Sequence, residues 1–388
     1  MRLAKRVSGI DESVTLEITS KAKKMAKEGI DVVSFAAGEP DFDTPRHIKD
    51  AAIKAINEGF TKYTPSSGMP ELREAIAKKF QADNGIDYTP AQIVVSNGAK
   101  HSLNNIFQAV CDAGDEVIIP APYWLSYPAM ASMAEAKPVF VETTASNGFK
   151  VTGEDLEAKI TGKTKCMVLN SPSNPTGGIY DIDDLRIIAK LAVKHNFFVI
   201  SDEIYEKLIY DGRKHHSIAS LGKDIYDRTI TVNGVSKSYS MTGWRIGYAA
   251  GPADVMKAIG NLQSHAASNP SSISQKAALA ALAGDQSFIE DMRKEYEKRR
   301  DYMVSRVSAM KNVSCFKPGG AFYLFCDVSK TGKDSIQTAN ALLDQAKVAV
   351  IPGGPFGAPG YIRLSFATGM EAIRKGMDRM EEYFRKNG

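Results

Sequence analysis

The chain has 388 residues, a net charge of +4 and 43% hydrophobic residues, as in an ordinary globular protein of two or three domains. It has no basic stripe, which argues against a nucleic-acid partner, and no apolar run approaches the roughly 20 residues of a membrane helix. Its four cysteines have no metal-ligand or redox spacing, and we expect a cytoplasmic location.

Apolar runs in the middle of the chain predict β-strands, with helical patterns such as Lys100–Cys111 and Asp181–Lys194 between most of them. The runs are mostly continuous rather than alternating, which is typical of strands covered on both faces. The expected fold class is α/β, with a mostly parallel seven-stranded sheet flanked by helices. The predicted strands are Gln92–Val95, Glu116–Pro120, Lys137–Glu142, Cys166–Asn170, Phe197–Asp202, Thr229–Val232 and Ile246–Ala250.

The connection between the last two of these strands is too short for a helical crossover. We therefore expect them to be antiparallel neighbours, which gives the sheet one antiparallel strand. Lys237 lies in this connection, in a turn rich in serine and glycine, with Arg245 eight residues further on. A lysine becomes nucleophilic when burial or nearby cations lower its pKa.

The pattern changes after a long charged helix predicted over Gln286–Lys311, which follows a helix starting at Pro252–Asn261. We assign Arg293, Lys294, Arg299 and Arg300 to the solvent face of the long helix. The elements beyond it predict a smaller α/β domain: strands Ala321–Asp327 and Tyr361–Phe366 and helices Gln337–Ala346 and Glu371–Arg385. The expected division is an N-terminal segment 1–45, a large domain 46–285 and a small domain 286–388. Within the first segment, Leu3–Gly29 is expected to form a helix that packs on the small domain or on a partner chain.

Polar residues follow several predicted strands, at the edge where open parallel sheets bind ligands. Gly98 in Ser96-Asn97-Gly98-Ala99-Lys100 opens a helix whose free N–H groups suit an anion, although such a turn is also common without a ligand. Trp124 can stack on a heteroaromatic ring or belong to the core. Asn174, between two prolines, is held rigidly, which is a structural feature in many proteins.

Two charged residues lie in or at the end of apolar strands. Asp202 closes one strand and needs a cationic partner if it is buried, such as a protonated pyridine nitrogen, although it could also cap a helix. Tyr205 lies three residues further on. Arg363 lies in a late strand, where its guanidinium fits either a ligand carboxylate or an internal ion pair. A lysine, an acid, an amide, an indole and two arginines together are what pyridoxal phosphate chemistry requires.

With these motifs, the chain resembles the fold type I pyridoxal-phosphate aminotransferases of class I/II, nearly from end to end. Within them it is similar to the bacterial and archaeal aspartate aminotransferases. The resemblance is carried by Ala37-Gly38-Glu39-Pro40-Asp41-Phe42, Asn174-Pro175-Thr176-Gly177, Ser201-Asp202-Glu203-Ile204-Tyr205, Ser236-Lys237 and Met241-Thr242-Gly243-Trp244-Arg245.

The resemblance implies a role for each residue around pyridoxal 5'-phosphate. Lys237 forms the internal aldimine and, once freed, carries the proton between Cα and C4′. Asp202 pairs with the pyridine nitrogen, Asn174 and Tyr205 hydrogen-bond the ring oxygen, and Trp124 stacks on the ring. The residues implied for the phosphate are Arg245, Ser236, the backbone N–H groups of Gly98, Ala99 and Lys100, and Tyr63 from the neighbouring subunit, so a homodimer is expected.

For the substrate, the resemblance implies that Arg363 clamps the α-carboxylate with help from the Gly38 backbone, next to Trp124 and Asn174. Lys100 and Thr15 match residues that line the pocket for the side-chain carboxylate. Asp11-Glu12 stand where prephenate-using members carry a basic residue, which argues against prephenate.

The implied reaction is ping-pong transamination of L-aspartate and 2-oxoglutarate to oxaloacetate and L-glutamate. An aromatic, alanine or kynurenine aminotransferase and a carbon–sulfur β-lyase remain alternatives, because they use the same lysine and aspartate. A pyridoxal-binding transcription regulator is disfavoured, since the resemblance leaves no room for a DNA-binding domain.

Overall fold

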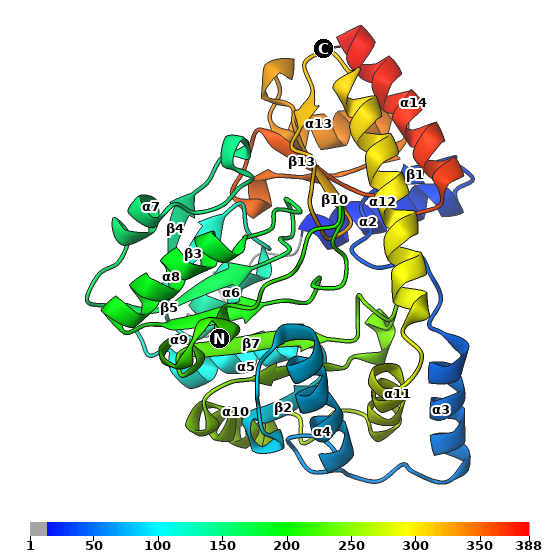
Figure 1. Ribbon diagram of the computed structural model, residues 1–388. Helices are drawn as coiled ribbons and strands as arrows, with labels where there is room; N and C mark the ends of the chain where they lie inside the picture. The colour runs from blue at the N-terminus through cyan, green and yellow to red at the C-terminus, as the bar shows by residue number, and fades with distance from the viewer. Residues whose placement is uncertain (1–13, 388) are drawn as a thin grey trace, which may run out of the picture.

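The structure, a computed structural model, describes residues 14–387, and side chains from residue 17 onward. Its centre is a seven-stranded sheet in the order β2-β8-β7-β6-β5-β3-β4, which occupies the left and lower-middle part of Figure 1. Strand β8 is antiparallel to β2 and β7, and the other pairs are parallel, which confirms the predicted sheet and its one antiparallel strand. The strands are β2 (Ile93–Ser96), β3 (Glu116–Ala121), β4 (Lys137–Glu142), β5 (Thr164–Asn170), β6 (Phe198–Asp202), β7 (Thr229–Gly234) and β8 (Gly247–Ala250).

Helices cover both faces of this sheet, because successive side chains of its strands point to opposite faces and are apolar on both. On one face lie α5 (Ala99–Val110), α6 (Ser126–Met133) and α10 (Ala253–Ala266). On the other lie α7 (Gly153–Glu157), α8 (Ile182–His195) and α9 (Lys223–Tyr226). Around β2 and β8 pack α3 (Arg46–Asn57), α4 (Pro70–Lys79) with its π-helical continuation η1 (Phe80–Asn84), and α11 (Ser272–Ala283).

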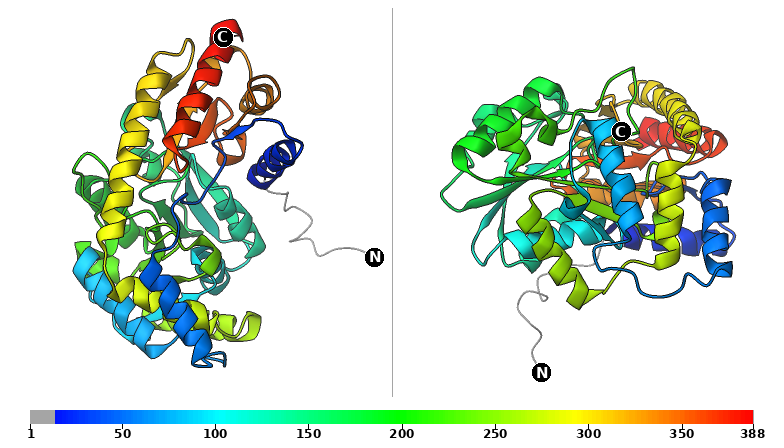
Figure 2. Two further views of the ribbon diagram at one scale, coloured as in Figure 1. Left: turned by 90° about the vertical axis from the view of Figure 1, so that its right-hand side faces the viewer. Right: turned by 60° about the horizontal axis from the view of Figure 1, so that its bottom comes forward.

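The C-terminal part is built on a second, antiparallel sheet of four strands in the order β12-β13-β10-β9. The long helix α12 leads into it and packs against α14, as Figure 2 shows. No helix within residues 14–387 is long and apolar enough to cross a membrane. The elements are α12 (Ser287–Ser308), β9 (Ser314–Cys315), β10 (Tyr323–Asp327), α13 (Ser335–Ala341) with η7 (Leu342–Ala346), β11 (Val348–Ala349), β12 (Ile351–Pro352), β13 (Tyr361–Ser365) and α14 (Met370–Asn387).

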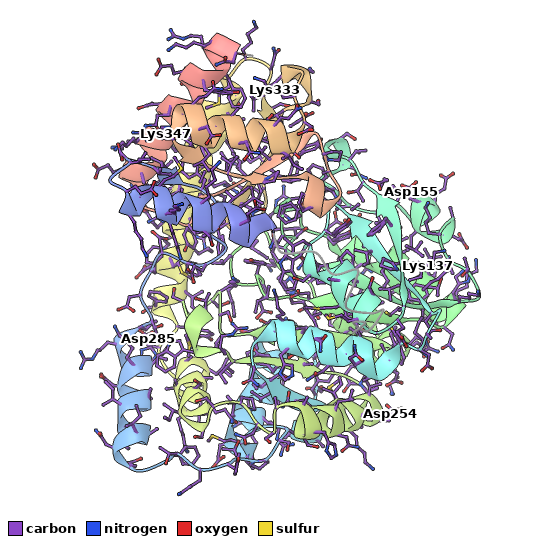
Figure 3. All side chains as sticks on the ribbon, turned by 180° about the vertical axis from the view of Figure 1, so that it is seen from behind. Lys137, Asp155, Asp254, Asp285, Lys333 and Lys347 are labelled. Atoms are coloured by element: carbon purple, nitrogen blue, oxygen red, sulfur yellow. The ribbon has the colours of Figure 1, made fainter. Side chains whose placement is uncertain are left out.

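The first two described elements, α2 (Val14–Lys27) and β1 (Val33–Ser34), pack on this C-terminal part. Strand β1 pairs in parallel with β11. Strand β11 begins directly after Lys347, which is labelled in Figure 3. Helix α2 packs on β11 and β12. The predicted helix over Leu3–Gly29 lies partly outside the described residues, and the division of the chain at residues 45 and 285 stays a prediction.

The assignment of Arg299 and Arg300 to the solvent face of α12 is wrong. Arg300 is fully buried and donates to both carboxylate oxygens of Asp211 at 2.8 Å. Arg299 is also buried and donates to Asp41 at 2.9 Å. A buried guanidinium requires such partners, so these two arginines fix α12 to loops from distant parts of the chain.

Candidate active site

A cavity of about 810 Å³ opens where the carboxyl ends of β5 and β6 meet the C-terminal part of the chain. It brings together most of the residues predicted from the sequence, although they come from distant segments. Those lining it are Gly38, Ala99, Lys100, Trp124, Asn174, Asp202, Tyr205, Ser236, Lys237, Arg245 and Arg363. The residues that follow these strands lie at one edge of the sheet, because β2, β3, β5, β6 and β7 run in one direction and so end on the same side.

Lys237 projects into this cavity from the turn between β7 and β8. Its ammonium donates to the Gly38 carbonyl at 2.5 Å and lies 5.8 Å from the centre of the Tyr205 ring. Burial lowers the pKa of Lys237 to about 8, opposed by the Glu39 carboxylate and assisted by Arg363 and Arg245. A lysine in this state supplies a free amine near neutral pH, which is what a nucleophile or a general base needs.

Asp202 ends β6 and is only 3% exposed. Its carboxylate accepts a hydrogen bond from the Tyr127 hydroxyl at 2.7 Å and another from the Ile204 N–H at 3.2 Å. Burial nevertheless raises the pKa of Asp202 to about 6, because these two bonds only partly replace water. The buried acid therefore favours a cationic ligand group beside it.

Tyr127 was not predicted from the sequence. It lies in α6, three residues after Trp124, and its ring meets the indole edge to face with the centroids 5.3 Å apart. Its place three residues after Trp124, in the first turn of a helix that follows a strand end, was the only available signal.

The N-terminus of α5 and Arg245 form one anion-binding corner. Gly98 precedes α5 with φ 86°, and a Cβ there would lie 2.3 Å from Arg245 Nη2, so only glycine fits without displacing the guanidinium. Arg245 donates to the carbonyls of Thr242 at 2.9 Å and Asn97 at 3.2 Å. The first N–H groups of a helix have no intrahelical acceptor, and the hydroxyl-bearing Ser236 lines the same cavity. Together these donors suit a phosphate.

Arg363 lies on β13 and is 2% exposed. It donates to Asn174 Oδ1 at 3.0 Å and to the Ala36 carbonyl at 3.3 Å, while its Nε has no hydrogen-bond partner. Within the described residues no carboxylate pairs with it, so the internal ion pair considered as an alternative is not present there. A buried guanidinium with donors to spare is a receptor for a ligand carboxylate.

A pair of tyrosines lies between Arg363 and Lys237. The hydroxyls of Tyr205 and Tyr323 are 2.9 Å apart, and the Arg363 guanidinium stacks 4.3 Å from the centre of the Tyr323 ring. Tyr323 was missed because it lies within an apolar strand, where a tyrosine is usually a core residue. On the other side, Asn170 Oδ1 accepts from the Asn174 N–H at 2.9 Å and so holds the Asn174 loop.

Of the remaining predicted residues, one lies in the cavity, one lies outside it, and the side chain of one is not described. Lys100 lines the cavity, but its ammonium lies 4.8 Å over the Trp124 ring, and burial, followed by Arg245, lowers its pKa. Tyr63 is 89% exposed and does not line the cavity. The side chain of Thr15 lies outside the described residues.

Behind Asp202, a buried cluster of Glu203, Glu206 and His215 has ligand atoms within 4.8 Å of one another. Lys79 contacts Glu206, and the Asn84 amide donates to Glu203 at 3.2 Å and to Glu206 at 2.7 Å. Glu206 thus already pairs with Lys79, and His215 Nε2 lies 2.8 Å from Glu203 Oε2, so the cluster is a structural ion-pair network.

This fold and constellation define an enzyme of the transaminase type. The chain belongs to the family of class I and II aminotransferases, whose model matches residues 30–379. It is 50% identical over 388 residues to the aspartate aminotransferase of Geobacillus stearothermophilus, with 99% of each chain covered. It is 47% identical to the probable aspartate/prephenate aminotransferase of Aquifex aeolicus, with 98% of each covered. A solved structure of the Thermus thermophilus aspartate aminotransferase with maleate superimposes with a TM-score of 0.95 at 44% identity, covering 98% of this chain and all of that one.

Proposed function

We propose that this aminotransferase uses pyridoxal 5'-phosphate and exchanges the amino group of L-aspartate with 2-oxoglutarate, giving oxaloacetate and L-glutamate. The observation that carries the proposal is the convergence of Lys237, Asp202 and Arg363 on one cavity. An amine, an acid and a carboxylate receptor are the groups that amino-acid transamination requires. The relatives named aspartate aminotransferase support the choice of substrate.

The cavity fits each end of the proposed cofactor. Arg245, Ser236 and the start of α5 would hold the phosphate, and Asp202 would hold the ring nitrogen. Asn174 and Tyr205 would hold the ring oxygen, and Trp124 would cover the ring face. The raised pKa of Asp202 reflects an acid without a cationic partner, which a protonated pyridine nitrogen would supply.

When bound, pyridoxal phosphate supplies an electron sink that lets the substrate Cα lose its proton. Lys237 would hold the cofactor and then take and return that proton, since its lowered pKa, about 8, leaves a usable fraction of free amine. Arg363 would orient the amino acid by its α-carboxylate, and the aromatic rings around Lys237 would exclude water.

Lys100 is the group proposed to select a dicarboxylate. It lines the cavity on the side of Trp124, where its ammonium lies 4.8 Å over the indole ring and pairs with no carboxylate among the described residues. A second ligand carboxylate would compensate that charge. The Thermus thermophilus aspartate aminotransferase was solved with maleate, which is a dicarboxylate and is in keeping with such a site.

A homodimer with shared active sites belongs to the same proposal. Tyr63 is almost fully exposed, as a residue that reaches a second copy of the chain must be before assembly. The predicted cytoplasmic location and the predicted exclusion of prephenate stay predictions.

The test is a set of spectrally monitored half-reactions. The purified protein should absorb in the visible range, and L-aspartate should bleach that absorbance faster than L-phenylalanine or L-alanine does. Pyruvate release from cystathionine without a keto acid would instead indicate a β-lyase. A Lys237→Ala protein that turns over normally would overturn the mechanism.

Lys100→Ala tests the substrate choice. Loss of one charge-assisted contact should lower kcat/KM for aspartate roughly 10- to 100-fold and change that for alanine little. The matched control is Lys23→Ala, which removes another lysine of the same cavity wall. Equal losses for aspartate and alanine in the Lys100 variant would exclude a dicarboxylate role.

A further inference from the structure

We propose that Tyr323 is a positioning residue for the cofactor, whose hydroxyl donates to Tyr205 and so couples the substrate-binding Arg363 to the ring oxygen. The inference rests on the proposed function and goes further, because it assigns a role to a residue outside the predicted site. Tyr323 lies on β10 opposite Ser365 of β13, is buried, and lines the cavity.

The geometry links Arg363 to Tyr205 by a short path. The guanidinium of Arg363 lies 4.3 Å from the centre of the Tyr323 ring, within cation–π range. The Tyr323 hydroxyl lies 2.9 Å from the Tyr205 hydroxyl. Phe322 packs against both tyrosines, with ring centroids 5.4 Å from Tyr205 and 4.7 Å from Tyr323, so the rings hold their orientation.

Proton counting decides the direction of the hydrogen bond between the two tyrosines. Each phenol carries one proton and therefore donates once. If Tyr205 donates to the ring oxygen, as proposed above, its bond with Tyr323 requires the Tyr323 hydroxyl to be the donor. A hydroxyl that accepts a hydrogen bond becomes a stronger donor itself, so Tyr323 strengthens the bond from Tyr205 to the ring oxygen.

The charge of Arg363 affects these two hydrogen bonds. A cation over the Tyr323 ring draws electron density from the phenol and makes its O–H a better donor. A substrate carboxylate on Arg363 neutralises that charge, which weakens both hydrogen bonds in sequence. Carboxylate binding would then change the hydrogen bond to the ring oxygen of the cofactor. This route is separate from the direct contact between Arg363 and Asn174.

The measurable consequence is the protonation of the nitrogen that joins Lys237 to the cofactor. Donors to the ring oxygen withdraw density from that nitrogen and lower its proton affinity. The charged and titratable groups facing Tyr205 are Arg363, Lys237, Asp202, Tyr127 and Tyr323, and Tyr323→Phe removes only the last of them.

The experiment is a pH titration of the visible absorbance of holoenzyme, with and without saturating maleate. Tyr323→Phe keeps the stacked ring and removes the hydroxyl. We expect it to raise the pKa of the chromophore by about half a unit to one unit, and to reduce the further rise caused by maleate. The kcat for aspartate should fall several-fold, while KM and the maleate Kd stay within about twofold.

Tyr210→Phe is the matched control, because Tyr210 belongs to the same buried cluster and its hydroxyl donates to the Ala321 carbonyl, away from the cavity. It should leave the titration unchanged. In a Tyr205→Phe background, Tyr323→Phe should have no further effect on the chromophore, since the linking hydroxyl is gone.

Two outcomes would overturn the proposal. One is a Tyr323→Phe protein that titrates like the wild type with an unchanged maleate response, and the other is that the effects of Tyr205→Phe and Tyr323→Phe on the chromophore add. These failures are distinct from failure of the proposed function. If the proposed function fails, the wild-type protein would show no visible chromophore or no bleaching by aspartate.

Discussion

Replacing Asp202 with asparagine should stabilise the cofactor-free protein against unfolding while it abolishes transamination. Asp202 is buried with no ion-pair partner among the described residues, and burial raises its pKa from 3.8 to about 6 although the Lys237 charge opposes this. An acid whose pKa is higher in the folded than in the unfolded state lowers the free energy of unfolding. This loss of stability is absent below the pKa of the unfolded state. The loss grows as the pH rises between the two values and is complete above the folded one. Asparagine has the same shape and no charge to desolvate.

The size of the effect follows from these two pKa values. A difference of about two units corresponds to about 3 kcal/mol at pH 8, and about half of that applies at pH 5. Asparagine can still accept from Tyr127, but it turns an amide NH₂ toward the Ile204 N–H, which costs about 1 kcal/mol. The expected net gain is about 2 kcal/mol at pH 8 and less than about 1 kcal/mol at pH 5.

Urea unfolding of the cofactor-free proteins at one protein concentration, at both pH values, measures this gain. Asp87→Asn, at an exposed aspartate, is the control and should change the free energy of unfolding by less than about 0.5 kcal/mol at either pH. A gain for Asp202→Asn that is equal at pH 5 and pH 8, or a loss at pH 8, would refute the account of Asp202 as a desolvated acid.

Gly98→Ala should raise the cofactor dissociation constant at least about tenfold, because its Cβ would lie 2.3 Å from Arg245 Nη2. Gly114→Ala has a similar φ, 88°, and open space around it, so it should cost similar stability and leave cofactor binding unchanged in an equilibrium titration. Arg300→Met should lower the free energy of unfolding by about 2–3 kcal/mol, whereas Lys294→Met, on the exposed side of α12, should cost less than about 1 kcal/mol by denaturant titration.

The sequence was sufficient for the main sheet and for one edge of the site. Continuous apolar runs mark buried strands, and the parallel arrangement then brings their carboxyl ends together. The antiparallel placement of β8 followed from the length of a single connection, the one that contains Lys237. In each case the deciding interactions are local in the chain or follow from the period of a strand.

What the sequence could not predict depends on pairs that are distant along the chain. Arg299 and Arg300 follow a helical pattern of charges, and the partners that bury them, Asp41 and Asp211, belong to other segments. Tyr127 and Tyr323 have the same difficulty, because a tyrosine in an apolar element looks like core until its hydroxyl partner is known. Helix and strand periods predict which face is buried, but not what a buried polar atom contacts.

The charge of the cavity supports the proposal that Lys237 carries the chemistry and that Lys100 selects the substrate. Five cationic side chains line the cavity against two carboxylates, Asp202 and Glu39, and only Asp202 is buried. A ligand that fits must therefore be anionic at several points and cationic at the one that meets Asp202. The proposed phosphorylated pyridinium would meet that demand around Lys237 and Asp202. Lys100 remains without a partner among the described carboxylates, and its ammonium lies 4.8 Å over the Trp124 ring. A second substrate carboxylate is the ligand group that would compensate it, and aspartate brings one.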